Sequence, residues 1–442
     1  MSDYLSLLMF PLLILFIFAG FQVAFSMILV ATIFGLMQFG DVTAYQLLSK
    51  IEETATNSIL AAVPLFIFMG AMLEKSGIAE RLFKAIHMWT HGMPGGLGVG
   101  AVLLGTIFAA ASGVVGATEA VIGMLAIPIM MKHAYDKRLL SGVICASGSL
   151  GTAIPPSITV IVLGPVAGVS VGQLFSGLLL PGLMMATLFI LYVIVLSWLK
   201  PAVAPRQIED GEGYSLKERL VATFTALLPA AILIFAVLGT ILMGLATPTE
   251  AAACGALGSI ILAACYRNLK LQVMWSSLMS TVNISAMILL IVLGGNMFAG
   301  VFFAAGGMAT VQSVLLGTGL EAWAILALIL IIAFLAGFVL DMMSVVLIVI
   351  PVAMPVVRIL GFDEVWFCVA FLVVLQTSYL TPPLAPSIFY LRAITPPDIS
   401  LRHMYAGVVP FIVIQLLVLT AVLAFPDTAL WLPDVMGGPA WE

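Results

Sequence analysis

Charged side chains are scarce in this sequence. Its 442 residues include only 16 lysines and arginines and 21 aspartates and glutamates, about 8% of the chain. A soluble domain typically carries about 25% charged residues, so this chain could not cover a water-facing surface. The apolar residues form long runs instead, such as 5–37 and 323–357, and runs beyond about 18 residues are typical of transmembrane helices. The sequence therefore predicts an all-α, polytopic membrane protein without a sizeable aqueous domain.

Cysteines, basic tracts and catalytic motifs are also scarce. The four cysteines lie in apolar segments without the spacing of metal ligands, which indicates inert thiols. No run of lysines or arginines suggests a nucleic-acid partner. The chain has no His-rich helix, no Gly-x-Ser-x-Gly elbow and no paired intramembrane aspartates. These absences argue against a membrane-embedded enzyme.

Ten apolar segments are predicted to cross the membrane fully. They are 2–19, 21–38, 54–73, 139–168, 173–198, 220–243, 249–266, 275–303, 365–392 and 404–425. Two further apolar stretches, 97–131 and 323–357, are interrupted by polar and small residues. Each half is about 15 residues, too short to span alone, so both stretches are predicted to be re-entrant hairpins.

The distribution of basic residues predicts the orientation. If the N-terminus is outside, fourteen of the sixteen lysines and arginines fall inside, and only Lys50 and Arg358 fall outside. This split follows the positive-inside rule. Both termini are therefore predicted to be external, with the first hairpin opening to the cytoplasm and the second to the outside. The polar segment 199–219 is predicted to be a cytoplasmic linker between the halves 1–198 and 220–442.

The two halves are predicted to form an inverted repeat, because each holds five crossings and one hairpin. A shift of 227 residues places Pro155 and Pro156 on Pro382 and Pro383. Adjacent prolines remove two N–H donors and force the preceding residue out of the helix, so 139–168 and 365–392 are predicted to be unwound in the middle. Paired broken helices beside hairpins are the best sequence indicator of a transporter site at the midplane. Freed carbonyls suit Na⁺, and half-helix N-termini suit a carboxylate.

Six ordered motifs carry a family resemblance. They are VPLFIFMG at 63–70, MPGGL at 93–97, FAAASG at 108–113, GTAIPPS at 151–157, ATPTEAAA at 246–253, and QTSYLTPP at 376–383 with its continuation to Leu391. The sequence resembles the large membrane subunit of TRAP (tripartite ATP-independent periplasmic) transporters, the DctM-like family, over essentially its whole length. It departs from common family patterns at Val114 and Val115, at Glu119, and at Leu384-Ala385-Pro386, where a Gly is frequent.

The resemblance implies a secondary carrier in the bacterial inner membrane with an elevator-type fold. It implies Na⁺-driven uptake of a small organic acid with no other cofactor. It also implies two protein partners, a small four-helix (DctQ-like) membrane subunit and a periplasmic (DctP-like) substrate-binding protein. The chain lacks the four extra helices of fused family members, so a separate small subunit is expected.

Two Na⁺ sites are predicted at the hairpins and broken helices, because a hard cation prefers oxygen ligands. The first set is Ser112, Gly113, Gly148, Ser149, Gly151 and Thr152. The second set is Gly337, Asp341, Ser344, Thr377, Ser378 and Thr381. The candidate substrate ligands are Ser157, Asn296 and Ser387. Bonding of each hydroxyl to its own helix remains the alternative for every Ser and Thr.

Three intramembrane acids require separate interpretations. A charge near the bilayer centre costs upward of about 2.5 kcal/mol, so Asp341 is interpreted as functional. Glu119 and Glu250 each have two open interpretations, a functional intramembrane acid or a helix cap: Glu250 at a predicted helix start near the outer surface, and Glu119 at the second half of its hairpin. A channel-like or structural subunit remains the alternative function. The two hairpins are predicted to enter the membrane from opposite sides, and this arrangement favours a carrier with one central gated site.

Overall fold

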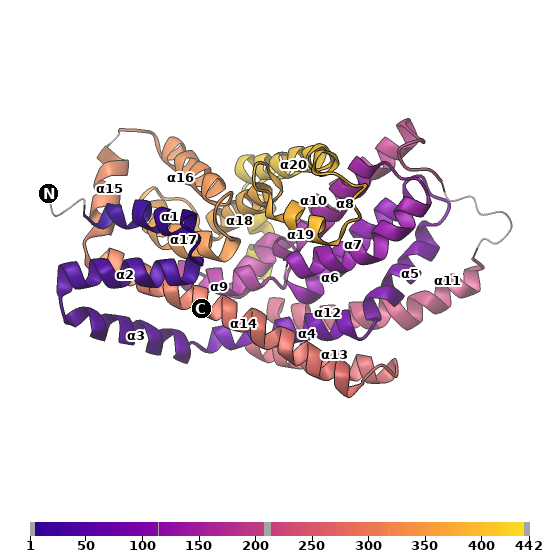
Figure 1. Cartoon of the computed structure of the whole chain (residues 1–442), viewed down its shortest axis with the longest axis horizontal. Helices are drawn as coiled ribbons and strands as arrows, with labels where there is room; N and C mark the ends of the chain where they lie inside the picture. Colours follow the sequence, from indigo (N-terminus) through magenta and orange to yellow (C-terminus); the bar gives the residue numbers. More distant parts are fainter. Residues whose placement is uncertain (1–4, 114, 207–213, 318, 437–442) are drawn as a thin grey trace.

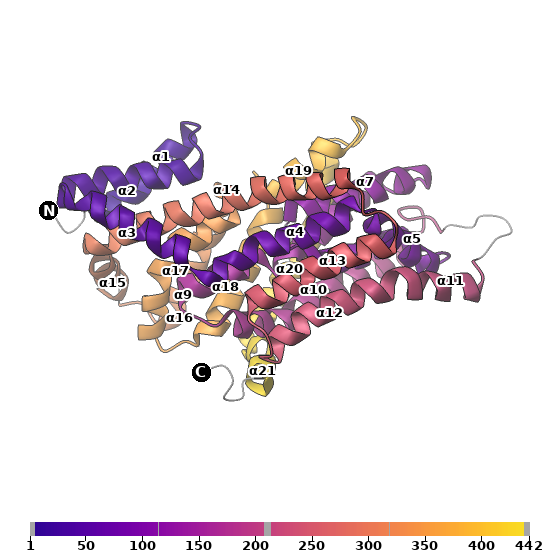
Figure 2. The same cartoon turned by 90° about the horizontal axis from the view of Figure 1, so that it is seen from below.

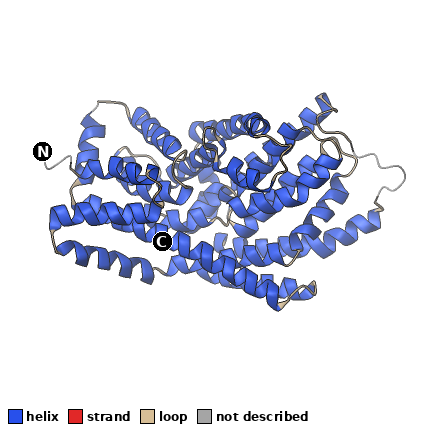
Figure 3. Cartoon of the chain, viewed as in Figure 1, coloured by secondary structure: helices blue, strands red, loops and turns tan. Residues whose placement is uncertain are grey.

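The computed structural model of the chain describes residues 5–113, 115–206, 214–317 and 319–436. Within these ranges every regular element is helical (Figure 3). The molecule is elongated, with α15 near one end of its long axis and α5 and α11 near the other (Figure 1). Both termini, residues 1–4 and 437–442, lie outside the described residues, so their predicted external position stays a prediction.

In its described residues, the first half of the chain forms ten α-helices. They are α1 (Met9–Phe18), α2 (Val23–Phe39), α3 (Val42–Thr56), α4 (Ala62–Lys75), α5 (Ile78–Thr90), α6 (Gly96–Ser112), α7 (Val115–Lys132), α8 (Lys137–Ser149), α9 (Ile158–Ala167) and α10 (Val171–Leu199). Short 3₁₀ turns, η1 (Ser6–Leu8), η2 (Ser58–Ala61) and η3 (Leu150–Thr152), adjoin α1, α4 and α8.

The second half forms the remaining helices. They are α11 (Leu216–Ala222), the π-helical segment η4 (Thr223–Leu227), α12 (Leu228–Leu242), α13 (Pro248–Cys265), α14 (Leu271–Ala304), α15 (Gly307–Gly317), α16 (Ala322–Ala336), α17 (Met342–Ile359), α18 (Glu364–Leu380), α19 (Pro386–Ile394), α20 (Leu401–Ala424) and α21 (Asp427–Met436). The helix α11 begins inside the predicted linker 199–219, of which residues 207–213 are not described.

A layer of long helices runs along one side of the molecule. The helix α14 packs against α2, α3 and α4, while α13 packs between α4 and α12 (Figures 1 and 2). Within the described ranges, seven helical segments are long and apolar enough to cross a membrane, and six shorter apolar helices accompany them. Large apolar side chains such as Phe235, Leu271 and Trp275 face outward, as lipid contact requires. The chain is therefore a multi-pass membrane protein.

Several predicted boundaries differ from the observed ones. Within the described part of the predicted crossing 2–19, helix runs from Ser6 to Phe18, which is short of the roughly 20 residues that a membrane requires. The sequence reading also missed α3 and α21. The glutamate of the motif at 246–253, Glu250, closes a capping box with Thr247 at the start of α13, which confirms its interpretation as a cap.

The two predicted hairpins are helix pairs at opposite ends of the long axis. The pair α6–α7 lies toward the end that holds α5, and the pair α16–α17 lies toward the end that holds α15 (Figures 1 and 2). The helices α8 and α20 pack closely against each other between the two hairpins. Their backbones are so close that a Cβ on Gly142 would overlap the carbonyl of Gly407. Such small-residue contacts let membrane helices approach each other.

Candidate functional site

The first predicted broken helix is interrupted where its prolines stand. The helix α8 ends at Ser149, η3 follows, and α9 restarts at Ile158. The Pro155–Pro156 peptide bond is cis. Among the described residues, no hydrogen bond is directed at the carbonyl oxygens of residues 152–156. The break therefore exposes backbone acceptors inside the protein, the arrangement that a cation site requires.

The second predicted broken helix has the same form. The helix α18 ends at Leu380, the Pro382–Pro383 bond is cis, and α19 begins at Pro386. The residue before α19, Ala385, has φ of +43°, in the left-handed region. A glycine accepts this region without the cost that a Cβ imposes. This chain therefore places a strained alanine here.

The tip of the first hairpin packs directly on the first bend. Gly113 ends α6 at φ +61°, and a Cβ on it would lie 2.9 Å from the carbonyl oxygen of Pro156. The Ser112 hydroxyl donates to the carbonyl of Phe108 and lies 2.9 Å from the hydroxyl of Thr118. On its other side, Ser112 meets Gly70 of α4, where a Cβ would lie 2.7 Å from the Ser112 Cα. The tip is thus held between the bend and α4.

The tip of the second hairpin packs on the second broken helix. A Cβ on Gly337 would overlap the hydroxyl of Ser378, so only a glycine fits at this approach. Asp341 caps α17, and its carboxylate accepts hydrogen bonds from the backbone N–H of Met343 and Ser344 and from the Ser344 hydroxyl. Asp341 is itself exposed.

A buried polar cluster joins the two broken helices. The amide of Gln376 on α18 donates to the Ser149 hydroxyl at 3.4 Å, and the amide of Gln415 on α20 donates to the same hydroxyl at 3.3 Å. All three side chains are buried. The Gln415 Oε1 has no hydrogen-bond partner. Since buried polar atoms are nearly always paired, this oxygen marks a place where a water or an ion fits.

Glu119 joins the first hairpin to the second half of the chain. Its carboxylate accepts a hydrogen bond of 2.6 Å from the Ser387 hydroxyl at the start of α19, and its second oxygen has no partner. Its side chain fills the space that Gly148 leaves, where a Cβ would overlap its Cγ. Glu119 is buried and lies beyond the first turn of α7. Its predicted role as a helix cap is therefore wrong, because its partner is a side chain of the other half.

Two tyrosines connect the surroundings of both hairpin tips. Tyr379 and Tyr390 each interact electrostatically with Glu119 and with Asp341. The ring of Tyr390 also packs on Gly116, near the start of α7.

The structure brings the residues predicted for each Na⁺ site together only in part. In the first site, Gly113 meets the bend, and Ser149 and Thr152 lie on the segment that leads into it. In the second, Gly337 meets Ser378, and Asp341 meets Ser344. The hydroxyls of Ser149, Thr152, Thr377, Ser378 and Thr381 each donate to a carbonyl of the same helical segment. The Ser149 hydroxyl also accepts from Gln376 and Gln415, which occupies its two lone pairs. The other hydroxyls, with nearby carbonyls and one carboxylate, fit a hard cation.

The three predicted substrate ligands do not form one site. Ser387 bonds Glu119, and Ser157 is buried beside Gly113 with its hydroxyl unpaired. Asn296 on α14 donates to the Thr54 hydroxyl at 3.0 Å and lines a separate crevice beside α3. Sequence reasoning missed Gln376, Gln415, Tyr379 and Tyr390. Gln376 stands next to a predicted ligand, and its polarity inside an apolar run was the available signal.

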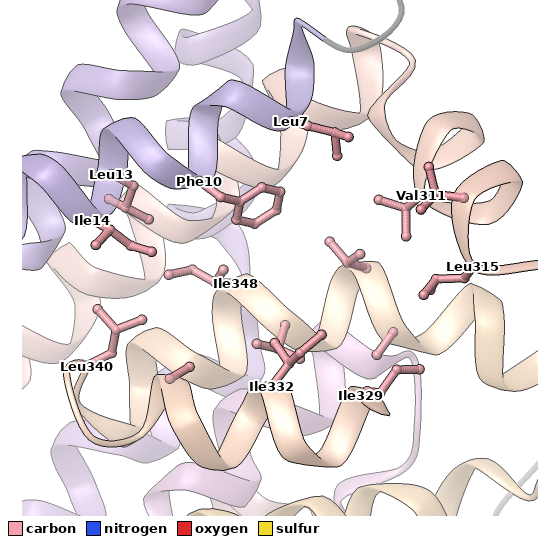
Figure 4. Close-up of a pocket in the computed structure, with 15 residues that line it drawn as sticks. Leu7, Phe10, Leu13, Ile14, Val311, Leu315, Ile329, Ile332, Leu340 and Ile348 are labelled. Carbon is pink, nitrogen blue, oxygen red and sulfur yellow. The ribbon is translucent and has the colours of Figure 1, made fainter. Parts of the chain in front are cut away.

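A cavity of about 400 Å³ lies between α1, α15 and the α16–α17 pair (Figure 4). Its walls are aliphatic and aromatic, with Phe10, Leu13, Ile332 and Ile348 pointing inward (Figure 4). Without a polar group this cavity cannot orient an organic anion, because a binding pocket needs a few placed polar groups for specificity.

Comparison with known proteins gives consistent matches over nearly the whole chain. The family profile described as the tripartite ATP-independent periplasmic transporter, DctM component, matches residues 10–428. The chain is 30% identical to the C4-dicarboxylate TRAP transporter large permease protein DctM of Pseudomonas aeruginosa, over 91% of this chain and 92% of the relative. It is 28% identical to the sialic acid TRAP transporter large permease protein SiaM of Vibrio cholerae, over 96% and 97% of the two chains.

Two further matches concern assembly and fold. The chain is 28% identical to the isethionate TRAP transporter permease protein DctMQ of Oleidesulfovibrio alaskensis, over 84% of this chain and 58% of the relative. Among solved structures, the YdaH transporter of Alcanivorax borkumensis matches 98% of this chain and 100% of its own with a TM-score of 0.65. At 13% identity this likeness concerns the fold alone.

Proposed function

Because the chain belongs to the DctM family of TRAP transporter large permeases, we propose that it imports a small organic acid by coupling its movement to Na⁺. The relatives are named as permeases for C4-dicarboxylate, sialic acid and isethionate, all organic anions, and not as enzymes. The observation that supports coupling is the contact of each hairpin tip with a broken helix, at Gly113 and at Gly337.

Na⁺ would be held by the oxygen atoms at the two bends. In the first site these are the hydroxyls of Ser112 and Thr152 with nearby carbonyls, and in the second the Asp341 carboxylate with nearby hydroxyls. The bound ion supplies positive charge that attracts an organic anion to the region between the tips. The residues of the chain orient that anion and keep apolar lipid away from it.

The assembly and the motion belong to the same proposal. The hairpins and broken helices would move as one transport domain against the layer of α2, α4, α13 and α14, in the manner of an elevator. A separate small four-helix subunit would complete the scaffold, and the fused name of the DctMQ relative supports this partner. A periplasmic binding protein would deliver the substrate to the external face of the inner membrane.

Uptake into proteoliposomes tests Na⁺ coupling. The chain, its small subunit and its binding protein, loaded with the acid that this binding protein retains, are reconstituted with and without an inward Na⁺ gradient. We expect saturable uptake and counterflow that depend on the gradient. Equal uptake without Na⁺, or non-saturable conduction, would contradict the proposal.

Asp341→Asn tests the ion site, because Asn still caps α17 but removes the charge. We expect the half-saturating Na⁺ concentration to rise about tenfold or more, since tenfold corresponds to only about 1.4 kcal/mol. The matched control is Asp363→Asn, because Asp363 caps α18 in the same way outside the site. An equal effect of both substitutions would show that capping, and not ion binding, is responsible.

A further inference from the structure

A polar crevice lies apart from both predicted Na⁺ sites. It has a volume of about 210 Å³ and runs between α3 and α14 on one side and α9 and α17 on the other. Lys50, Glu53, Asn57 and Asn296 supply its polar lining, and Val166 and Pro351 part of its apolar lining. Among the described residues, none predicted for either Na⁺ site lines it. The crevice therefore combines apolar walls with a few convergent polar groups, as ligand sites do.

Lys50 is positioned to face an anion in this crevice. Its aliphatic stem lies along Gly300 of α14, where a Cβ would stand 3.0 Å from the lysine Cε. Its ammonium group pairs with Glu53 at 2.6 Å, and the Lys50 and Glu53 side chains are 34% and 62% exposed. An exposed pair three residues apart on one helix contributes little stability. A second carboxylate can therefore displace Glu53 from Lys50 at low cost.

The two asparagines add hydrogen-bond donors beside the ammonium. Asn57 uses its Oδ1 to accept from the backbone N–H of Ile59, which leaves its amide group to donate. Asn296 donates to Thr54 from the facing helix α14 and has a second N–H. An ammonium and two amides are the groups that recognise a carboxylate.

We propose that this crevice is a second, external site for the carboxylate group of the transported acid, apart from the region between the hairpin tips, with Lys50 as its charge partner and Glu53 as the internal competitor. The proposal rests on the proposed function, because it takes a carboxylate as the substrate. The crevice holds roughly seven water molecules, given about 30 Å³ for each. This volume suits an acid of a few carbon atoms, or the carboxylate end of a larger one.

Protection of an introduced thiol tests the site. The exposed Cys254 and Cys265 are replaced by Ser, while the buried Cys145 and Cys368 remain. Val166→Cys then places a thiol in the crevice wall of the full chain, purified with its small subunit. The rate of labelling by N-ethylmaleimide is measured against succinate concentration, with uncharged succinamide as the matched probe.

We expect succinate to slow labelling and succinamide to leave it unchanged. Lys50→Met should raise the half-protective succinate concentration about tenfold or more, the effect of losing roughly 1.4 kcal/mol. Glu53→Gln should lower that concentration, because the competing carboxylate is gone. Lys84→Met on α5, which removes a basic group that does not line this crevice, should leave it unchanged.

Three results would overturn the inference: no protection by succinate, equal protection by succinamide, or unaltered protection in Lys50→Met. Labelling is carried out in potassium buffer without any gradient. If uptake does not depend on Na⁺ but succinate still protects the thiol, the proposed coupling is refuted and the carboxylate site in the crevice stands. If uptake depends on Na⁺ but succinate does not protect the thiol, only the crevice site is refuted.

Discussion

Ser387 is the hydrogen-bond partner on which the buried Glu119 depends. Its hydroxyl donates to one carboxylate oxygen at 2.6 Å, and the other oxygen has no partner. The substitution Ser387→Ala leaves both oxygens unpaired within a buried environment. An unsatisfied buried polar group costs about 1–3 kcal/mol, and a charged one costs more. We therefore expect Ser387→Ala to reduce the free energy of unfolding by at least about 1 kcal/mol.

The double substitution separates this cost from a simple loss of packing. Replacing both partners by apolar groups of similar shape is nearly neutral or stabilising. We therefore expect the pair Glu119→Met and Ser387→Ala to unfold with a free energy close to that of the wild type. Together with the single variants Glu119→Met and Ser387→Ala, the double variant completes a double-mutant cycle. The deviation of its free-energy change from the sum of the single changes gives the coupling energy of the contact.

Unfolding by SDS in mixed micelles, followed by circular dichroism, measures these free energies. The control is Ser176→Ala, because Ser176 is equally buried but bonds only the carbonyl of Gln173 in its own helix. We expect this control to cost less than about 0.5 kcal/mol. If Ser387→Ala costs no more than the control, or if the double variant loses the sum of the single losses, the reasoning fails.

Three further predictions concern single positions. Gly148→Ala should impair folding, because the new Cβ overlaps the Glu119 side chain, and adding Glu119→Ala to the same chain should restore folding. Thermal unfolding measures both effects, and a double variant no more stable than Gly148→Ala would contradict the contact. Ala385→Gly should raise the unfolding free energy by up to about 1 kcal/mol, since it relieves a left-handed alanine. Ala370→Gly within α18 is its control and should lower stability by a similar amount. Glu250→Ala should lower the midpoint of thermal unfolding through loss of the capping box, and an unchanged midpoint would refute that role.

The interruptions of the helices could be predicted from the sequence because their causes are local. Adjacent prolines end α8–η3 and α18, and small residues separate α6 from α7. The side-chain partners could not be predicted in the same way. Glu119 and Ser387 are 268 residues apart, and neither residue carries a signal that names the other.

The missed helix α3 shows a different limit. Its fifteen residues, which include Lys50, Glu52 and Glu53, are too few for a crossing. Only packing against α14 and α2 explains why it forms a helix. Helices of this length take most of their stability from tertiary contacts rather than from their own sequence.

The two basic residues that depart from the positive-inside pattern share a structural feature. Lys50 pairs with Glu53, and Arg358 pairs with Glu364; these are the two salt bridges found within the described ranges. Arg358 also donates to the carbonyl of Ala167 at the end of α9. Each positive charge thus has a neighbouring acid, and the orientation of the chain stays a prediction.

The contact between Gln376 and Ser149 bears on the inverted repeat. These residues are 227 positions apart, the same shift that superimposes the paired prolines, and neither residue was used to choose it. In an arrangement with approximate two-fold symmetry, a residue touches its own symmetry mate only near the axis. The contact therefore supports an axis that passes between α8 and α18, with the two bends on either side.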